Sequence, residues 1–165
     1  MPRPSDVGVG TACLIYKVIG SKFEILLMKR QGAHCADQWA VPGGWLDRPD
    51  ETTSGAVCRE VAEETGIILE KSLVCHYKWT TEDHPSIRCR SVTLYHTAKL
   101  PDGQTPQIME PHKCSEMRWV GFSELVSLMK IEPMFPGLDS VLADFCIGLS
   151  MTLIHAPEEE SESEE

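Results

Sequence analysis

The sequence contains no apolar run of the roughly 18–20 residues that a membrane-spanning helix requires. Its N-terminus also lacks the pattern of a charged and then apolar secretory signal. There is no Cys-x-x-Cys pair, and the seven cysteines are scattered and odd in number. This usage argues against a zinc site or a disulfide framework and favours reduced thiols. We therefore expect a soluble, cytoplasmic protein with no membrane partner.

Basic residues are also scarce, since 15 lysines and arginines stand against 25 aspartates and glutamates, for a formal charge of −10. Six of these negative charges are glutamates between positions 158 and 165, so the rest of the chain carries a net charge of only −4. A body of this sign argues against a stable nucleic-acid partner. An anionic substrate would have to be met locally, by a metal ion and selected basic residues.

The length fits one domain that buries a core of its own. Residues 1–6 include two prolines and are expected to form a flexible leader. The domain itself is assigned to residues 7–156. Residues 157–165 are rich in glutamate and serine and cannot bury apolar surface, so we expect a disordered acidic tail there.

Apolar patterning and turn residues predict a mixture of strands and helices. Strands are expected at 7–18, 24–29, 38–41, 68–79, 90–100 and 117–120. Residues 82–87 are expected to form a polar turn. Helices are expected at 52–65, from 122 to a proline-rich break at 133–136, and at 138–149, with Ser123 capping the second. Periodicity therefore indicates an α/β or α+β fold with a mixed sheet.

The helix at 52–65 organises the rest of the sequence. Thr52 can cap its N-terminus, and Gly66 stands where a left-handed residue would end it. At 100° per residue, Glu60, Glu63 and Glu64 fall on one stripe about 100° wide. The side expected to face the core carries Cys58, Val61, Ala62 and Thr65.

Three carboxylates on one stripe cost a helix a few tenths of a kcal/mol for each like-charged pair. Arg59 can offset only part of this repulsion. A dense cluster of oxygens on a rigid element is suited to a hard divalent cation such as Mg²⁺, which is usually held by a few carboxylates together with substrate phosphates. The alternative for three glutamates alone is an ordinary solvated acidic face.

A longer pattern surrounds these glutamates. Residues 59–67 read Arg-Glu-Val-Ala-Glu-Glu-Thr-Gly-Ile, Glu51 precedes Arg59 by seven intervening residues, and Gly43-Gly44 lie upstream. This segment resembles the catalytic motif of the Nudix hydrolases. It departs from the family in one respect, because six rather than five residues separate Gly44 from Glu51, and Pro49-Asp50 replaces the usual glycine. We interpret this as a one-residue bulge in the loop that leaves the helix intact.

The resemblance implies a Nudix-type α/β/α sandwich and the hydrolysis of a nucleoside diphosphate linked to another group, with Mg²⁺ or Mn²⁺ as cofactor. It implies that Glu60 and Glu64 bind the metal. Glu63 would bind it through water or act as the base that activates the nucleophile. A backbone carbonyl of Gly43 or Gly44 would complete the coordination, because a residue without Cβ allows close approach.

The same resemblance gives two other motif residues structural roles. Glu51 would pair with Arg59 and tie the loop to the helix. Gly66 would end the helix.

Outside this motif the expectations rest on position. Arg30 and Lys113 are candidate phosphate contacts, although a solvated side chain is an alternative for each. Nudix enzymes often draw a further carboxylate from the region before the last strand, and either Glu110 or Glu116 could supply it. The loop before the last helix resembles the base pocket of purine-triphosphate members, so Phe135 and Leu138 are candidates to cover a base; core packing is the alternative.

The similarity to MutT-type enzymes extends over about residues 7–145, through Val-Gly-Val-Gly, Trp-Ala-Val-Pro-Gly-Gly and Glu-Pro-x-Lys-Cys. It points to (d)NTPs, including oxidised or modified purines, cleaved to a monophosphate and pyrophosphate. An ADP-ribose, dinucleotide or cap pyrophosphatase is the alternative. A non-catalytic nucleotide sensor is a second one, against which the three retained glutamates argue. Homodimers are common in the resembled group, which leaves a homodimer open for this chain.

Overall fold

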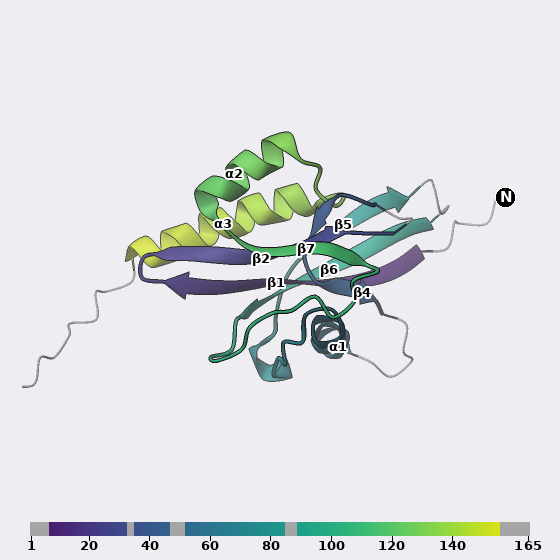
Figure 1. The fold of residues 1–165 in the computed structure, drawn as a ribbon, viewed down its shortest axis with the longest axis horizontal. Coiled ribbons are helices and arrows are strands. Elements are labelled where there is room, and N and C mark those ends of the chain that lie inside the picture. Colours follow the sequence, from purple (N-terminus) through teal and green to yellow (C-terminus); the bar gives the residue numbers. More distant parts are fainter. Residues whose placement is uncertain (1–6, 33–34, 47–51, 85–88, 156–165) are drawn as a thin grey trace, which may run out of the picture.

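The computed structural model describes residues 7–32, 35–46, 52–84 and 89–155 (Figure 1). These residues form a seven-stranded sheet, three α-helices and one 3-10 turn. The strands are β1 (Val7–Ile19), β2 (Lys22–Arg30), β3 (Trp39–Ala40), β4 (Gly43–Trp45), β5 (Cys75–His84), β6 (Cys89–Lys99) and β7 (Cys114–Gly121). The helices are α1 (Thr53–Thr65), α2 (Phe122–Ile131) and α3 (Leu138–His155), and the 3-10 turn is η1 (Lys71–Leu73).

The sheet is mixed, with the order β3-β2-β1-β6-β5, while β4 pairs with β1 and β7 pairs with β2. β1 runs parallel to β6 and antiparallel to β2 and β4. α1 lies on one face of the sheet, and α2 and α3 lie on the other (Figure 1). The expected sandwich of a mixed sheet between helices is therefore confirmed.

The central strand β1 contributes to a core on each face, because successive side chains of a strand point in opposite directions. Ala12 and Leu14 pack on the α3 side, with Val141 and Leu142. The α1 side takes the alternate positions, where Cys13 and Ile15 pack with Val57 and Val61. Burying a side chain of the size of leucine stabilises a fold by about 1.5–3 kcal/mol, so the two cores fix α1 and α3 to the same strand.

Residues 10–12 of β1 have a neighbouring strand on each side. β4 pairs through Trp45, Gly44 and Gly43 on one edge, and β6 pairs through Thr93, Leu94 and Tyr95 on the other. The two edges of one short segment therefore hold two elements that are about 50 residues apart in the sequence.

Several expected boundaries are wrong. Residues 68–74 are not part of a strand, because the Ile68 amide bonds to the Gln104 side chain and residues 71–73 form η1. β5 begins at Cys75 and continues to His84, into the expected polar turn. The pair Gly43-Gly44 lies in the short strand β4 rather than in a loop. Gly121, not Ser123, is the N-cap of α2, and it makes no side-chain capping bond. α3 runs to His155, beyond Leu149, because Leu153 continues its packing against the core.

Other expectations concern the ends of the chain and its thiols. The leader at 1–6 and the acidic tail at 157–165 lie outside the described residues, as does Glu51. Within the described part of the chain, no helix is long and apolar enough to cross a membrane. Six cysteines, at positions 13, 35, 58, 75, 114 and 146, are free thiols in the structure.

Candidate active site

Both ends of α1 are fixed by local contacts. The Thr52 hydroxyl accepts a hydrogen bond from the Gly55 amide at 3.1 Å, which satisfies one of the unpaired donors at the helix start. At the other end Gly66 adopts a left-handed conformation with φ of 72°, and its amide donates to the Ala62 carbonyl at 3.0 Å. The expected capping residues are confirmed, and the helix spans Thr53–Thr65.

The carboxylate stripe of α1 does not face bulk solvent. Glu60 and Glu64 are each only 9% exposed, whereas Glu63 is exposed. On the side expected to face the core, Val61 and Thr65 are buried, whereas Cys58 and Ala62 are half-buried. The buried side of the helix also includes Glu60 and Glu64, because β4 lies against both carboxyl groups.

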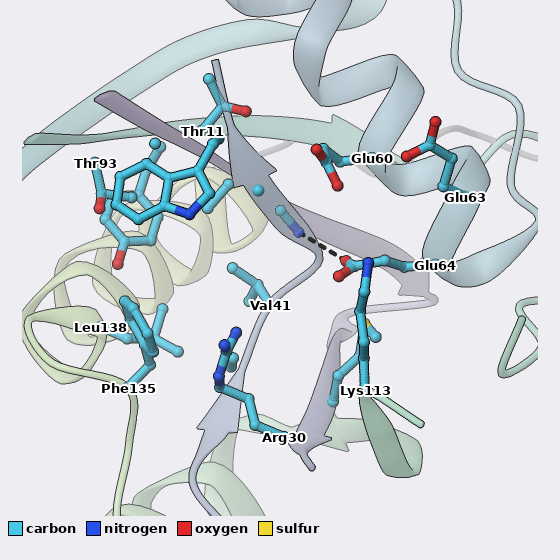
Figure 2. A pocket seen from close by; sticks show the side chains of 18 of the residues that line it. Thr11, Arg30, Val41, Glu60, Glu63, Glu64, Thr93, Lys113, Phe135 and Leu138 are labelled. Atoms are coloured by element: carbon cyan, nitrogen blue, oxygen red, sulfur yellow. Dashed lines mark hydrogen bonds between the residues drawn. The ribbon is translucent and has the colours of Figure 1, made fainter. Parts of the chain in front are cut away.

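Glu64 is held by the backbone of β4. Its Oε2 accepts a hydrogen bond from the Gly43 amide at 2.9 Å, drawn as a dashed line in Figure 2. Burial raises the pKa of Glu64 to about 7, which the Gly43 amide partly opposes, and the negative charges of Glu60 and Glu110 raise it further. A carboxylate in this setting is stabilised by any cation that comes close to it.

Glu60 lies between an arginine and a glycine. Its Oε1 is 2.5 Å from Arg59 Nη1, which also lies 3.3 Å from Oε2 of Glu63. The other Arg59 nitrogen donates to the Trp45 carbonyl at 3.3 Å and so links α1 to β4. A Cβ on Gly44 would overlap the Glu60 carboxyl group, so only glycine allows this approach.

Gly43 is equally constrained, from the other side of β4. A Cβ on it would overlap the backbone of Thr11 and Ala12 in β1. The two glycines therefore allow β4 to lie flat between β1 and the carboxylates.

These elements enclose a cavity of about 450 Å³. Figure 2 shows that its two ends differ. Glu60, Glu63 and Glu64 lie at one end, which we call the acid end, and Thr93, Phe135 and Leu138 lie at the other, which we call the base end. The Lys113 amine is directed toward Glu64 at the acid end, and Arg30 lies between Lys113 and Phe135. The cavity thus offers anionic, cationic and apolar surfaces in sequence.

The structure brings most of the residues singled out in the sequence to this cavity. Ten of them line it: Arg30, Gly43, Gly44, Arg59, Glu60, Glu63, Glu64, Lys113, Phe135 and Leu138. Glu110 lies behind Lys113, with its Oε2 2.9 Å from the Lys113 Nζ. Glu116, the other candidate for a further carboxylate, instead pairs with Arg118 on β7. The geometry therefore favours Glu110 over Glu116.

Hydrogen bonds to Trp39, on the short strand β3, hold the segment that carries Phe135, and we call the bonds made by Trp39 and Glu132 the clamp. The Phe135 amide donates to the Trp39 carbonyl at 2.7 Å, and the Trp39 amide donates to the Pro133 carbonyl at 2.9 Å. Glu132 Oε2 accepts from the Trp39 indole and from Lys29 Nζ, both at 2.8 Å. Both hydrogen bonds lower the pKa of Glu132, and the one from Lys29 has the larger effect.

The ring of Phe135 lies close to one of the cationic residues that line the cavity. The Arg30 guanidinium carbon lies 5.2 Å from the centre of the ring, within the range of a cation–π contact.

Four further lining residues were not singled out in the sequence, namely Thr11, Trp45, Ser91 and Thr93. Ser91, Thr93 and Tyr95 alternate along β6 and so share one face of it, a signal that was present in the sequence. Thr11 is buried, and its hydroxyl has no hydrogen-bond partner in the structure.

The donor set at the acid end suits a hard cation, although no preformed cage is present. The described residues contain no group of three or more His, Cys, Asp or Glu side chains arranged to hold a metal ion. The fit rests on two buried carboxylates, Glu60 and Glu64, and on a glycine backbone that approaches one of them closely. Oxygen donors of this type are the ones that Mg²⁺ and Mn²⁺ take.

Comparisons with known proteins agree with this geometry. The family model of the NUDIX domain matches residues 8–145. The structure of a MutT NUDIX hydrolase from Burkholderia pseudomallei superposes with a TM-score of 0.68 at 28% identity, over 84% of this chain and 97% of that one.

Two further structures share the fold at lower identity. One is a binary complex of a Caenorhabditis elegans Ap4A hydrolase, with a TM-score of 0.67 at 24% identity, over 87% of this chain and 98% of that one. The other is the NUDIX domain of Shewanella oneidensis NrtR complexed with ADP ribose, with a TM-score of 0.65 at 21% identity, over 83% and 85%.

The chain spans 46% of the length of another match, a MutT/nudix family protein from Enterococcus faecalis. The family match nevertheless covers the whole sheet, α1 and the start of α3. A sheet between helices, a capped helix with buried carboxylates and a match over residues 8–145 lead to one assignment: the chain belongs to the Nudix family and is a MutT-like Nudix hydrolase.

Proposed function

We propose that the cavity hydrolyses the diphosphate linkage of a nucleoside triphosphate, giving a monophosphate and pyrophosphate, with a (d)NTP as substrate and oxidised or modified purines among the candidates. The observation that supports this proposal is the order of surfaces along one cavity, in which carboxylates with Lys113 beside them are followed by Arg30 and then by an aromatic and apolar end. A polyphosphate joined to a base presents complementary groups in the same order.

The proposal assigns a divalent metal to the acid end, since Nudix hydrolases generally use such ions. Glu60 and Glu64 would hold Mg²⁺, or Mn²⁺ in its place, with a carbonyl of Gly43 or Gly44. When bound, the metal would neutralise phosphate charge and lower the pKa of an attacking water. Glu63 is the exposed member of the three and has room to accept a proton from that water.

The two cations would bind and orient the phosphates. Arg30 and Lys113 both line the cavity. A guanidinium can bind phosphate oxygens in a bidentate manner, while an ammonium acts as a point charge. Positioning of this kind provides much of the catalysis in phosphoryl chemistry, because few covalent steps are required of the protein.

The base end would bind the nucleobase. Phe135 offers a ring face and Leu138 an apolar wall, and Trp45 also lines the cavity. Thr93 and Ser91 place hydroxyl groups beside these surfaces, and a hydroxyl can both donate and accept a hydrogen bond. The end thus combines stacking with polar contacts to the edge of a base.

A turnover panel tests this proposal. It comprises the four dNTPs, oxidised dGTP, ADP-ribose, a dinucleoside tetraphosphate and capped RNA, each with Mg²⁺ or Mn²⁺ and with EDTA as control. We expect metal-dependent release of monophosphate and pyrophosphate from a triphosphate with the highest kcat/KM. A higher kcat/KM for ADP-ribose or the dinucleotide would shift the function to the alternative class. Binding without any product would indicate a nucleotide sensor.

The oligomeric state is a separate prediction. The resemblance leaves a homodimer open, and light scattering on the purified protein distinguishes a dimer from a monomer.

A further inference from the structure

The segment between β6 and β7 lies alongside the C-terminal end of α1, and Figure 1 shows it on the same side of the sheet as that helix. Within it, the Met109 amide donates to the Glu64 carbonyl at 3.1 Å and the Gln107 amide donates to the Thr65 carbonyl at 2.9 Å. The last carbonyls of a helix have no partners inside the helix. Residues 104–113, which we call the arm, thus complete the end of the helix that carries the glutamates.

The start of the arm is fastened by one side chain. Gln104 Oε1 accepts a hydrogen bond from the Ile68 amide at 2.7 Å, and Gln104 Nε2 donates to the Ile68 carbonyl at 3.0 Å. This two-way exchange reproduces with an amide side chain the bonding of one residue pair in an antiparallel ladder. It joins the arm to the chain that leaves α1.

Space remains between part of the arm and the sheet. A second cavity, of about 250 Å³, is lined by residues 105–108 on the arm and by Leu26, Met117 and Trp119 of the sheet. Hydrogen bonds to α1 and to Ile68 hold the arm beside this cavity.

The other end of the arm carries Lys113 into the active-site cavity. The Lys113 carbonyl accepts from the Gln31 amide at 2.7 Å, and its amide donates to the Glu110 carbonyl at 2.9 Å. Figure 2 shows the Lys113 amine directed toward Glu64. The hydrogen bond to Glu110 raises the pKa of Lys113, and the charges of nearby carboxylates raise it further, so the amine is a cation at neutral pH.

We propose that Gln104 is a positioning residue for catalysis: by fastening the arm to Ile68, it sets the place at which the Lys113 amine meets a substrate phosphate. This inference rests on the proposed function, because it assigns a phosphate to Lys113. Gln104 does not line the active-site cavity and acts through the arm alone.

The chain offers a matched control for this role. Gln107 is an exposed glutamine of the same arm whose hydrogen bond to α1 uses only its backbone amide, so Gln107→Ala keeps that bond. We expect Gln104→Ala to raise KM for the best triphosphate about 3- to 10-fold, with kcat changed less than about 2-fold, as for residues coupled through a shared partner. Gln107→Ala should match the wild type. Gln104→Glu, which keeps the acceptor and loses the donor, should fall between.

A double-mutant cycle with Lys113→Gln separates positioning from a general loss of stability. If Gln104 acts through Lys113, its replacement should have little further effect on KM in the Lys113→Gln background. An equal rise in KM with and without Lys113 would overturn the proposal. So would a Gln104→Ala enzyme that behaves like Gln107→Ala.

Failure of the proposed function can be told apart from failure of this inference. If the wild type hydrolyses no nucleotide, the proposed function is wrong, and hydrogen exchange of the backbone amides at positions 107 and 109 then tests the fastening alone. Faster exchange in Gln104→Ala than in Gln107→Ala would support it. Equal rates would overturn it.

Discussion

The two ends of the active-site cavity are built in different ways. The three glutamates of the acid end and the glycines that lie against them come from one stretch of the chain, since β4 and α1 both lie between Gly43 and Thr65. The base end is assembled from β6, from the loop before α3 and from α3 itself. Phe135 is held there by bonds to Trp39, almost 100 residues earlier in the chain. The acid end is thus specified locally, whereas the base end depends on the whole fold.

The largest effect on catalysis is expected at the acid end, when Glu64 is replaced. Replacing it with glutamine removes the buried negative charge that the proposal assigns to metal binding, so we expect kcat to fall by at least about 100-fold, as on loss of a metal or acid–base group. Steady-state kinetics with Mg²⁺ and circular dichroism check this result. Glu70→Gln, at an exposed glutamate outside the cavity, is the control and should retain full turnover. A Glu64→Gln enzyme with wild-type kcat would contradict the assignment of the acid end.

Gly44→Ala disturbs the same end without removing a charge. The added Cβ would overlap the Glu60 carboxyl group, so the carboxylate must move. We expect kcat to fall about 10- to 100-fold, because catalytic geometry tolerates only small displacements. Gly148→Ala, in a helix where a Cβ would meet no neighbour within 4 Å, is the matched control and should keep the wild-type kcat. Equal kcat values for the two variants would show that Glu60 needs no close backbone.

The pKa of Glu64 predicts a pH dependence of stability. Because this pKa is raised from 4.5 to about 7, the folded protein binds a proton more tightly than the unfolded chain does. The corresponding stability is present below pH 4.5 and is lost as the pH rises to about 7, by about 3 kcal/mol in total. Urea unfolding in EDTA between pH 5 and pH 8 measures it. The loss should be absent in Glu64→Gln, and parallel profiles for the two proteins would show that another group causes the dependence.

The smallest effect is expected at the base end, through the clamp that holds Phe135. Glu132→Ala removes the acceptor shared by Trp39 and Lys29, and we expect KM for the nucleotide to rise roughly 3- to 10-fold with little change in kcat. Glu132→Gln keeps one acceptor and should have a weaker effect. Inhibition by inorganic pyrophosphate, which reports on the phosphate region, should be unchanged in both. A fall in kcat as large as the rise in KM would instead show that the clamp also affects the acid end.

The same contrast explains what could be predicted from the sequence. The bounds of α1 and both of its caps follow from residues within one turn of each end, so local patterns sufficed. The shared stripe of Glu60, Glu63 and Glu64 was likewise a matter of helical spacing. The burial of Glu60 and Glu64 was not predictable, because it is caused by β4, and two adjacent glycines resemble a loop more than a strand.

The base end was harder to predict for the same physical reason. Phe135 was singled out only by resemblance, and its clamp by Glu132 and Trp39 depends on contacts that no local pattern encodes. Thr93 and Ser91 reach the cavity because β6 lies parallel to β1, a pairing that depends on tertiary structure. Ser123 was a wrong cap because strand β7 runs directly into α2 and Gly121 takes the position.

Because β1 lies between β4 and β6, the distance between these two strands is fixed by the sheet. Neighbouring strands lie about 4.8 Å apart, so the two that flank residues 10–12 are separated by about 10 Å of rigid sheet. Under the proposed function, a substrate would have to place its base and its phosphates at least this far apart to contact both ends of the cavity at once.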